Sequence, residues 1–333
     1  MQADARRRER ATARAERDAM RQHREHQRRV KEHTKYIEKL RAENEAEQFD
    51  RYLELLVSIH KNCTDDLDWE AIANSDPPAP PTQDRRHEVA ATMLVAAYKP
   101  GFFERLFGGA AKRLAVLQQG IMQGRAADHA AYLAATQAHA QAHASWATRR
   151  TLAQRILARD PGAYSLALEA LGALEDLESF ETEATLGAAE PDGVTFTCRV
   201  MDDEIVPREE VKLTSRGKTS TKAMAAGRYW ALYQDHVCST ALRLAREAFA
   251  VLPVSRAIVN IGPMSVNPQT GHREHMVFLA VHLARDAFKK LNLNNVDPSD
   301  SMKNFPHRMK FKKTTGFEPV MPMTLDENWM TSG

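Results

Sequence analysis

The chain has 333 residues, 43% of them hydrophobic, which is enough for ordinary cores and excludes wholesale disorder. Its formal net charge of +2 gives no global argument for a nucleic-acid or membrane partner. Three widely spaced cysteines without a CxxC pair argue against a disulfide framework or a structural zinc site. The N-terminal stretch has no secretory h-region, and no apolar run approaches the ~20 residues of a membrane span. We therefore expect a cytoplasmic protein with no membrane span.

Residues 1–62 are rich in Arg, Lys, Glu, Gln and Ala, most of which are good helix formers. Oppositely charged side chains often stand three or four positions apart, as a helix favours. Apolar residues are scarce at first and then form a ragged stripe near heptad spacing, made of Val30, Ile37, Leu40, Phe49, Leu53 and Leu56. We expect a long charged helix, partly coiled-coil-like, whose later part packs on another element.

Residues 63–83 are predicted to be a short helix followed by a Pro-rich linker. The sequence DDLDWEAIA at residues 65–73 is typical of a short capped helix. Four prolines between Ser75 and Thr82 favour an extended, polyproline-like backbone.

Residues 84–179 predict a helical bundle or hairpin. His87–Tyr98 is apolar on most faces, so we expect this helix to be buried, and Lys99-Pro100-Gly101 ends it. A long Ala-rich helical stretch follows at residues 126–158, whose small side chains permit close helix–helix approach.

The segment Phe102–Phe107 between these helices has two interpretations. Its four large apolar side chains, with Arg105 and Lys112 nearby, would suit a helix lying on a membrane surface. The neighbouring helices offer many apolar partners, so we expect a stripe that packs into the core.

Near residue 180 the hydrophobic period passes from 3.6 residues to two, which predicts an α+β domain at residues 180–320 and a flexible tail at 321–333. We expect a small mixed or antiparallel sheet, with strands at residues 180–186, 193–200, 205–213, 254–264 and 274–283. A strong amphipathic helix is expected at residues 229–252, and the polar, basic stretch 214–228 is expected to be a loop.

Pro191-Asp192 and Glu210-Val211-Lys212 stand in an order of helix, three strands, helix and strand over residues 162–262. In motif and element order this part is similar to the PD-(D/E)xK nucleases. The resemblance implies that Asp192 and Glu210 hold Mg²⁺ and that Lys212 assists the attacking water. The alternative is that Glu210 and Lys212 form a solvated pair on an edge strand. No other cofactor is expected.

Basic residues of the α+β domain are candidates for contact with nucleic acid, and they are Lys218, Lys222, Arg228, Lys310, Lys312 and Lys313. Arginines between Arg6 and Arg29 are further candidates for contact with phosphates. Phe305 and Phe311 stand among the last basic cluster and could stack on bases, or else anchor it to the core.

His139 and His143 stand four residues apart on a predicted helix, and His236 stands two residues from Cys238. No carboxylate accompanies the first pair at a diagnostic spacing, so we expect ordinary exposed polarity there. Residues two apart on a helix point to nearly opposite sides, so we expect Cys238 to be a buried structural residue.

Two hypotheses follow. The first is a non-enzymatic interaction or scaffold protein, in which the helical region mediates self-association or binds a protein partner and the α+β domain is a recognition module. The alternative is a metal-dependent nuclease acting on DNA or RNA.

Overall fold

The computed structural model describes residue 32 and residues 35–63, 66–266 and 270–327. The chain divides into two compact units, unit 1 formed by Met1–Asp66 with Leu168–Gly333, and unit 2 formed by Leu67–Ala167. Helices and a mixed sheet are both present, so the predicted α+β fold is confirmed. No helix in the described part of the chain is long and apolar enough to cross a membrane.

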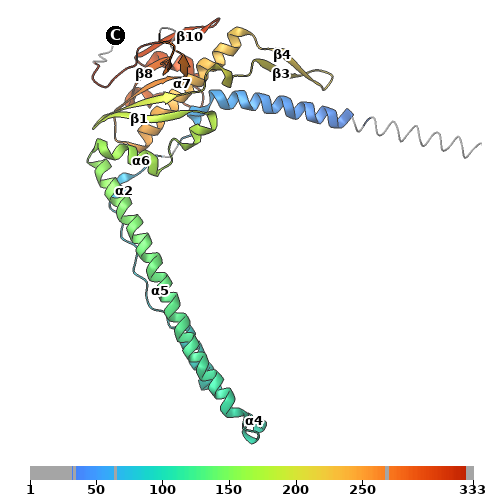
Figure 1. Ribbon diagram of the computed structural model, residues 1–333, viewed down its shortest axis with the longest axis vertical. Coiled ribbons are helices and arrows are strands. Elements are labelled where there is room, and N and C mark those ends of the chain that lie inside the picture. The colour runs from blue at the N-terminus through green and yellow to red at the C-terminus, as the bar shows by residue number, and fades with distance from the viewer. Residues whose placement is uncertain (1–31, 33–34, 64–65, 267–269, 328–333) are drawn as a thin grey trace, which may run out of the picture. The chain divides into compact units, whose positions relative to one another are not determined.

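Unit 2 is a helical hairpin built on the 49-residue helix α5 (Gly109–Leu157) (Figure 1). The shorter helices α2 (Trp69–Ala73), α3 (Arg86–Ala97) and α4 (Phe102–Leu106) all contact α5. Gly108 reverses the chain before α5 with a φ of 74°, in the left-handed region that favours glycine. The predicted hairpin is therefore present.

The sequence predicts the Pro-rich segment to be a linker. In the structure this segment lies along α5 and is hydrogen-bonded to it. Indole Nε1 of Trp146 donates to the carbonyl of Ser75 at 3.1 Å, and Nε2 of His139 bonds to the carbonyl of Pro78 at 3.0 Å. Arg150 Nε donates to the carbonyl of Ala73 at 3.0 Å. An extended, Pro-rich strand leaves carbonyls unpaired, and donors on α5 satisfy them.

The sequence predicts that α3 is buried, but this helix is partly exposed. Val89, Met93 and Leu94 are all exposed, because α5 covers α3 from one side only. Its apolar residues are distributed around the helix rather than along one stripe, so a single partner helix cannot cover them all.

Unit 1 contains a six-stranded sheet of order β1-β2-β5-β8-β9-β10. Strands β2 and β5 are parallel, and the other neighbouring strands are antiparallel. The strands are β1 (Glu183–Glu190), β2 (Gly193–Arg199), β5 (Arg256–Gly262), β8 (Leu279–Ala284), β9 (His307–Lys312) and β10 (Gly316–Glu318). Helix α7 (Ala226–Val251) packs against β5 and β8 and lies on the long connection that a parallel pair requires.

Two small hairpins depart from the predicted strands. The basic stretch expected as a loop contains β4 (Thr219–Ala223), which pairs with β3 (Glu209–Leu213) outside the main sheet. The strands predicted at 254–264 and 274–283 are each divided, with β6 (Met264–Val266) pairing with β7 (Arg273–His275). Strand β4 is polar, so its own sequence does not indicate a strand. Its hydrogen bonds to β3 hold it in an extended conformation.

The remaining elements of unit 1 are short, apart from the helix at residues 35–57. They include α8 (Arg285–Phe288), α9 (Pro298–Ser301) and the 3₁₀ helices η1 (Ile59–Lys61), η3 (Glu175–Phe180), η4 (Asp203–Ile205) and η5 (Met302–Asn304). Helix α6 (Tyr164–Ala170), which follows η2 (Pro161–Ala163), crosses the boundary between the units.

The described part of the predicted N-terminal helix packs on α7. Leu53 and Leu56 are buried as the stripe predicted, whereas Leu40 is exposed. The ring of His236 on α7 bonds to the carbonyl of Leu56 at 3.2 Å. Val30 and the arginines from Arg6 to Arg29 lie outside the described residues.

The segment expected to begin a flexible tail packs, as far as residue 327, on the sheet. Met323 and Leu325 are buried with Ile258 and Val277. The side chain of Asn260 bonds to the backbone of Met323 through its amide nitrogen at 2.9 Å and its oxygen at 2.8 Å. Asn260 therefore gives this segment a fixed register on β5.

Candidate functional site

Asp192, the first residue of the predicted nuclease motif, lies in the turn between β1 and β2. Its carbonyl accepts hydrogen bonds from the backbone nitrogens of Ser255 at 2.8 Å and Arg256 at 3.2 Å. Its carboxylate lies 3.6 Å from the guanidinium of Arg256. These contacts place Asp192 near the C-terminal end of α7, since Ser255 follows Val251 by four residues.

Glu210 and Lys212 lie at the other end of α7. The Glu210 carboxylate is 2.7 Å from Nζ of Lys212 and 3.0 Å from Nη1 of Arg228. The hydrogen bond from Lys212, with the charge of Arg228, lowers the pKa of Glu210. From Arg228 to Val251, α7 runs roughly 35 Å at ~1.5 Å per residue.

The structure therefore brings Glu210 and Lys212 together as an ion pair but leaves Asp192 apart from them. One divalent ion cannot bridge that separation, since oxygen ligands lie ~2.0–2.6 Å from Mg²⁺ or Ca²⁺. No group of three or more His, Cys, Asp or Glu side chains in the described residues could hold a metal ion. The resemblance to the nucleases implies that this strand is central in the main sheet. Instead, β3 lies outside the main sheet and pairs with β4.

The six basic candidates for nucleic-acid contact lie on several elements and partly face carboxylates. Arg228 pairs with Glu210, and Lys312 lies 2.6 Å from Glu318. Charge from Lys310 also acts on Glu318, and charge from Lys313 acts on Asp300. Lys218 and Lys222 are exposed, Lys222 on β4 and Lys218 just before it. Such matching of charges dilutes the positive field that phosphates require.

The histidine and cysteine pairs have structural surroundings. His139 bonds to the carbonyl of Pro78, so its role is a contact rather than simple exposed polarity. His143 stacks obliquely on Trp146 with ring centroids 5.2 Å apart. Cys238 is fully buried, as predicted, and burial raises the pKa of its thiol. Burial also lowers the pKa of His236 to about 4.

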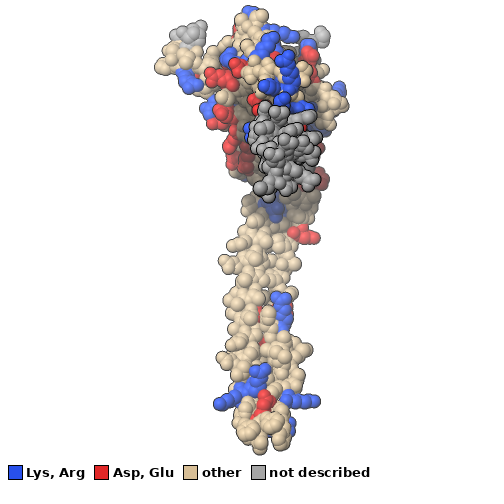
Figure 2. Space-filling model, turned by 90° about the vertical axis from the view of Figure 1, so that its right-hand side faces the viewer, with Lys and Arg blue, Asp and Glu red and all other residues tan. Residues whose placement is uncertain are grey.

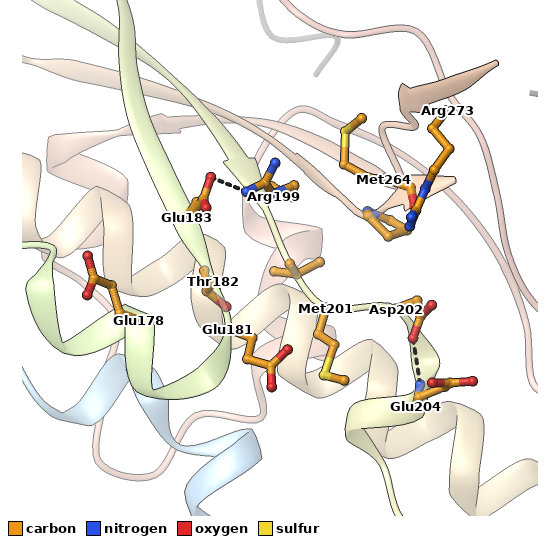
Figure 3. Close-up of a pocket in the computed structure, with 12 residues that line it drawn as sticks. Glu178, Glu181, Thr182, Glu183, Arg199, Met201, Asp202, Glu204, Met264 and Arg273 are labelled. Carbon is orange, nitrogen blue, oxygen red and sulfur yellow. Dashed lines mark hydrogen bonds and ion pairs between the residues drawn. The ribbon is translucent and has the colours of Figure 1, made fainter. Parts of the chain in front are cut away.

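A hollow of about 760 Å³ in unit 1 is a site that the sequence did not indicate (Figure 3). Five carboxylates contribute to its lining, from Glu178, Glu181, Glu183, Asp202 and Glu204. Arg199 pairs with Glu183, and Arg273 lies on the opposite wall. Its residues come from three separate stretches of the chain, 178–183, 199–204 and 263–273, so no local sequence motif predicts this hollow.

Glu181 at the rim of this hollow has a φ of 50°, in the left-handed region. A non-glycine residue there carries local strain.

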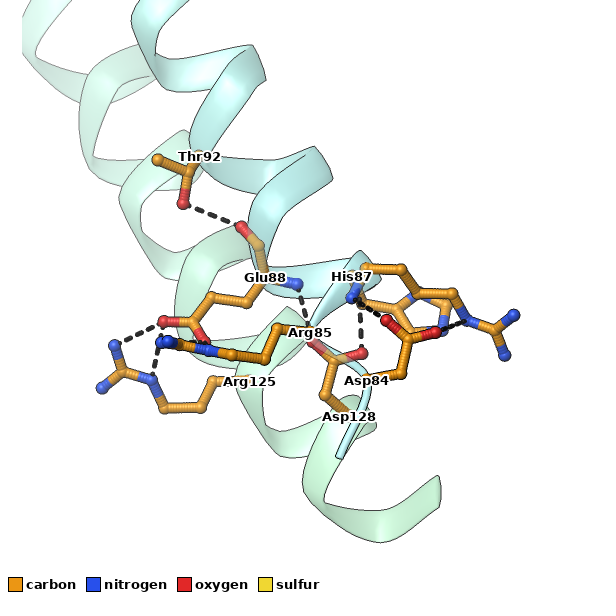
Figure 4. Close-up of polar contacts among 8 residues, drawn as sticks. Asp84, Arg85, His87, Glu88, Thr92, Arg125 and Asp128 are labelled. Carbon is orange, nitrogen blue, oxygen red and sulfur yellow. Dashed lines mark hydrogen bonds and ion pairs between the residues drawn. The ribbon is translucent and has the colours of Figure 1, made fainter. Parts of the chain in front are cut away.

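A polar clamp fixes the hairpin of unit 2 beyond its apolar contacts (Figure 4). The carboxylate of Asp128 on α5 accepts hydrogen bonds from the backbone nitrogens of His87 at 3.1 Å and Glu88 at 2.9 Å. Asp128 thereby caps the first turn of α3 from a neighbouring helix. Desolvation raises the pKa of this carboxyl, but the two backbone hydrogen bonds outweigh it and the pKa is lowered.

Glu88 forms the second half of the clamp. Its two oxygens each accept a bidentate pair, from Arg125 at 3.1 and 2.7 Å and from Arg85 at 3.0 and 2.9 Å. These hydrogen bonds lower its pKa. Gly124 permits this close approach, since a Cβ there would lie 2.7 Å from the carbonyl oxygen of His87.

Four large apolar side chains are exposed at the end of this hairpin. Phe102, Phe103, Leu106 and Phe107 have 75%, 71%, 65% and 78% of their surfaces exposed. The sequence favoured the core-stripe interpretation of this segment, and the structure corrects it. Helix α4 contacts α5 and lies at the end of the hairpin (Figure 1), where these four side chains stay exposed.

The middle of α5 differs from this end. No Asp, Glu, Lys or Arg stands between Asp128 and Arg149, whereas basic side chains gather toward the end of the hairpin (Figure 2, lower part).

Comparisons with protein-family models, curated proteins and solved structures give no match to this chain.

Proposed function

We propose that this protein is an interaction protein in which unit 2 is the binding arm and the end of its hairpin is the contact surface. We name this surface the apolar end and define it as Phe102, Phe103, Leu106 and Phe107. The observation that carries the proposal is the exposure of all four side chains, each by about two thirds or more.

The size of the apolar end favours a partner. A Phe side chain offers ~150–250 Å² to a contact, so the exposed fractions amount to on the order of 500 Å² in one place. The largest apolar patch on a typical monomer is about 300–600 Å² and is often functional. Leaving such an area in water opposes solubility, and covering it by a partner removes that cost.

The arm is suited to presenting this surface. The clamp of Asp128 and Glu88 fixes α3 on α5, and the Pro-rich segment is bonded along the same helix. A fixed support lowers the conformational entropy lost on binding.

The test is photo-crosslinking in the cells that make the protein. The full chain carries p-benzoylphenylalanine at Phe107, a replacement that keeps an aromatic ring, and a control carries it at Met321 in unit 1, which is 74% exposed. We expect a discrete adduct from position 107 that position 321 does not give. Positions 102, 103 and 107 all giving no more adduct than the control would refute the proposal.

A further inference from the structure

We infer that the apolar end docks on the surface of a membrane that contains anionic lipids. This inference rests on the proposed function and names the occupant of the same surface.

The apolar side chains form one face of a helical segment. Positions 102, 103 and 106 of α4 and its C-cap residue Phe107 fall within about 140° around the helix axis at ~100° per residue. Glu104 and Arg105 occupy the other side. Aromatic side chains on one face of an amphipathic segment suit the boundary between lipid headgroups and acyl chains.

The charges that flank this face are mostly positive. Lys99, Arg105, Lys112 and Arg113 stand within the stretch 98–114, against the single carboxylate of Glu104. That carboxylate accepts hydrogen bonds from the Tyr98 hydroxyl and the Gly101 backbone nitrogen, both at 3.0 Å. The net charge of this stretch exceeds that of the whole chain, which is +2. Basic residues beside an apolar face attract anionic headgroups.

The same charges oppose the main alternative, a second copy of this chain docked end to end. Two identical ends would bring four cations against four cations, and like charges placed opposite each other weaken association. The apolar end is bounded by Gly101, Gly108 and Gly109.

The test is flotation of the full chain with lipid vesicles. One set contains phosphatidylcholine only, and the other contains about 30% phosphatidylglycerol, which supplies the anionic surface. We expect binding to the second set at low ionic strength and weaker binding at ~0.5 M salt, because salt screens the attraction. Binding to neither set would overturn the inference.

Three variants locate the contact. Phe103→Ser with Phe107→Ser should weaken vesicle binding about 100-fold or more, because two exposed rings no longer enter the lipid. Arg105→Gln with Lys112→Gln should weaken it about 30-fold and reduce its dependence on salt. Leu133→Ser, on α5 and 55% exposed, is the matched control and should bind like the parent chain. Retained binding by the double phenylalanine variant would place the contact elsewhere and overturn the inference.

All substituted side chains are exposed, so circular dichroism should show unchanged helix content in each variant. The crosslinking experiment separates this inference from the proposed function. A lipid adduct at position 107 supports both, and a discrete protein adduct, including a second copy of the chain, keeps the proposed function and overturns the membrane partner. No adduct at all overturns both.

Discussion

Replacing Gly124 by alanine tests whether the close approach of α3 and α5 holds the hairpin together. An added Cβ would lie 2.7 Å from the carbonyl oxygen of His87, 2.8 Å from its carbonyl carbon and 3.0 Å from the nitrogen of Glu88. All three are backbone atoms, which cannot rotate away as a flexible side chain can. Helix α3 would have to shift by several tenths of an ångström, and the bonds from Asp128 to its first turn would lengthen.

Gly120 supplies the matched control, since it lies one turn earlier on α5 and a Cβ there meets nothing within 4 Å. Both alanines gain about 1 kcal/mol of helix propensity over glycine. Only Gly124→Ala also carries an overpacking cost of ~1–3 kcal/mol. We therefore expect Gly120→Ala to stabilise unit 2 by about 1 kcal/mol, and Gly124→Ala to range from about neutral to ~2 kcal/mol destabilising.

The assay combines urea unfolding, followed by circular dichroism, with hydrogen exchange of the peptide around residues 84–97. In Gly124→Ala the backbone amides of His87 and Glu88 should exchange faster, because they lose their bonds to Asp128. The reasoning is refuted if the two alanine variants shift the free energy of unfolding equally and leave exchange at these amides unchanged.

Three further outcomes are expected. Glu88 has a lowered pKa in the folded chain, so its contribution to stability is present above its ordinary pKa of 4.5. This contribution is lost as the pH falls through the pKa of the folded state. The melting temperature should therefore fall less steeply from pH 7 to pH 3 for Glu88→Gln than for the parent chain. Leu56→Ala should cost ~2–5 kcal/mol in urea unfolding, since this side chain is fully buried, whereas Leu55→Ala, half exposed, should stay within about 0.5 kcal/mol. Because Asp192 and Glu210 lie at opposite ends of α7, Mg²⁺ at millimolar concentration should leave the melting temperature unchanged, and a clear rise would show that a metal site exists.

The elements with strong periodicity could be predicted from the sequence. Gly193–Arg199 alternates and is rich in β-branched residues, and α7 carries a clear apolar stripe, so the sequence predicts both near their observed bounds. The sequence does not predict strand β4, because its residues are polar and its pairing with β3 is what makes it a strand. Local pattern contains no information on such a partner.

Candidate sites were harder to predict because they depend on which segments meet. The sequence identified Phe102–Phe107 as either a membrane-surface helix or a core stripe, and the exposed side chains decide against the core stripe. Asp192 and Glu210 stand 18 positions apart in the sequence, yet α7 separates them in space. The acidic hollow depends on three distant stretches, so only the tertiary structure brings it together.

The N-terminal helix leaves the ribosome long before the element that covers it. His236 on α7 bonds to the carbonyl of Leu56 across 180 residues. At ~5–20 residues per second, synthesis takes roughly 10 to 40 s to bridge that interval. During this time α7 does not yet cover Leu53 and Leu56, so these side chains are exposed to solvent. A nascent chain stopped before residue 226 should therefore be a substrate for chaperones that recognise short apolar segments.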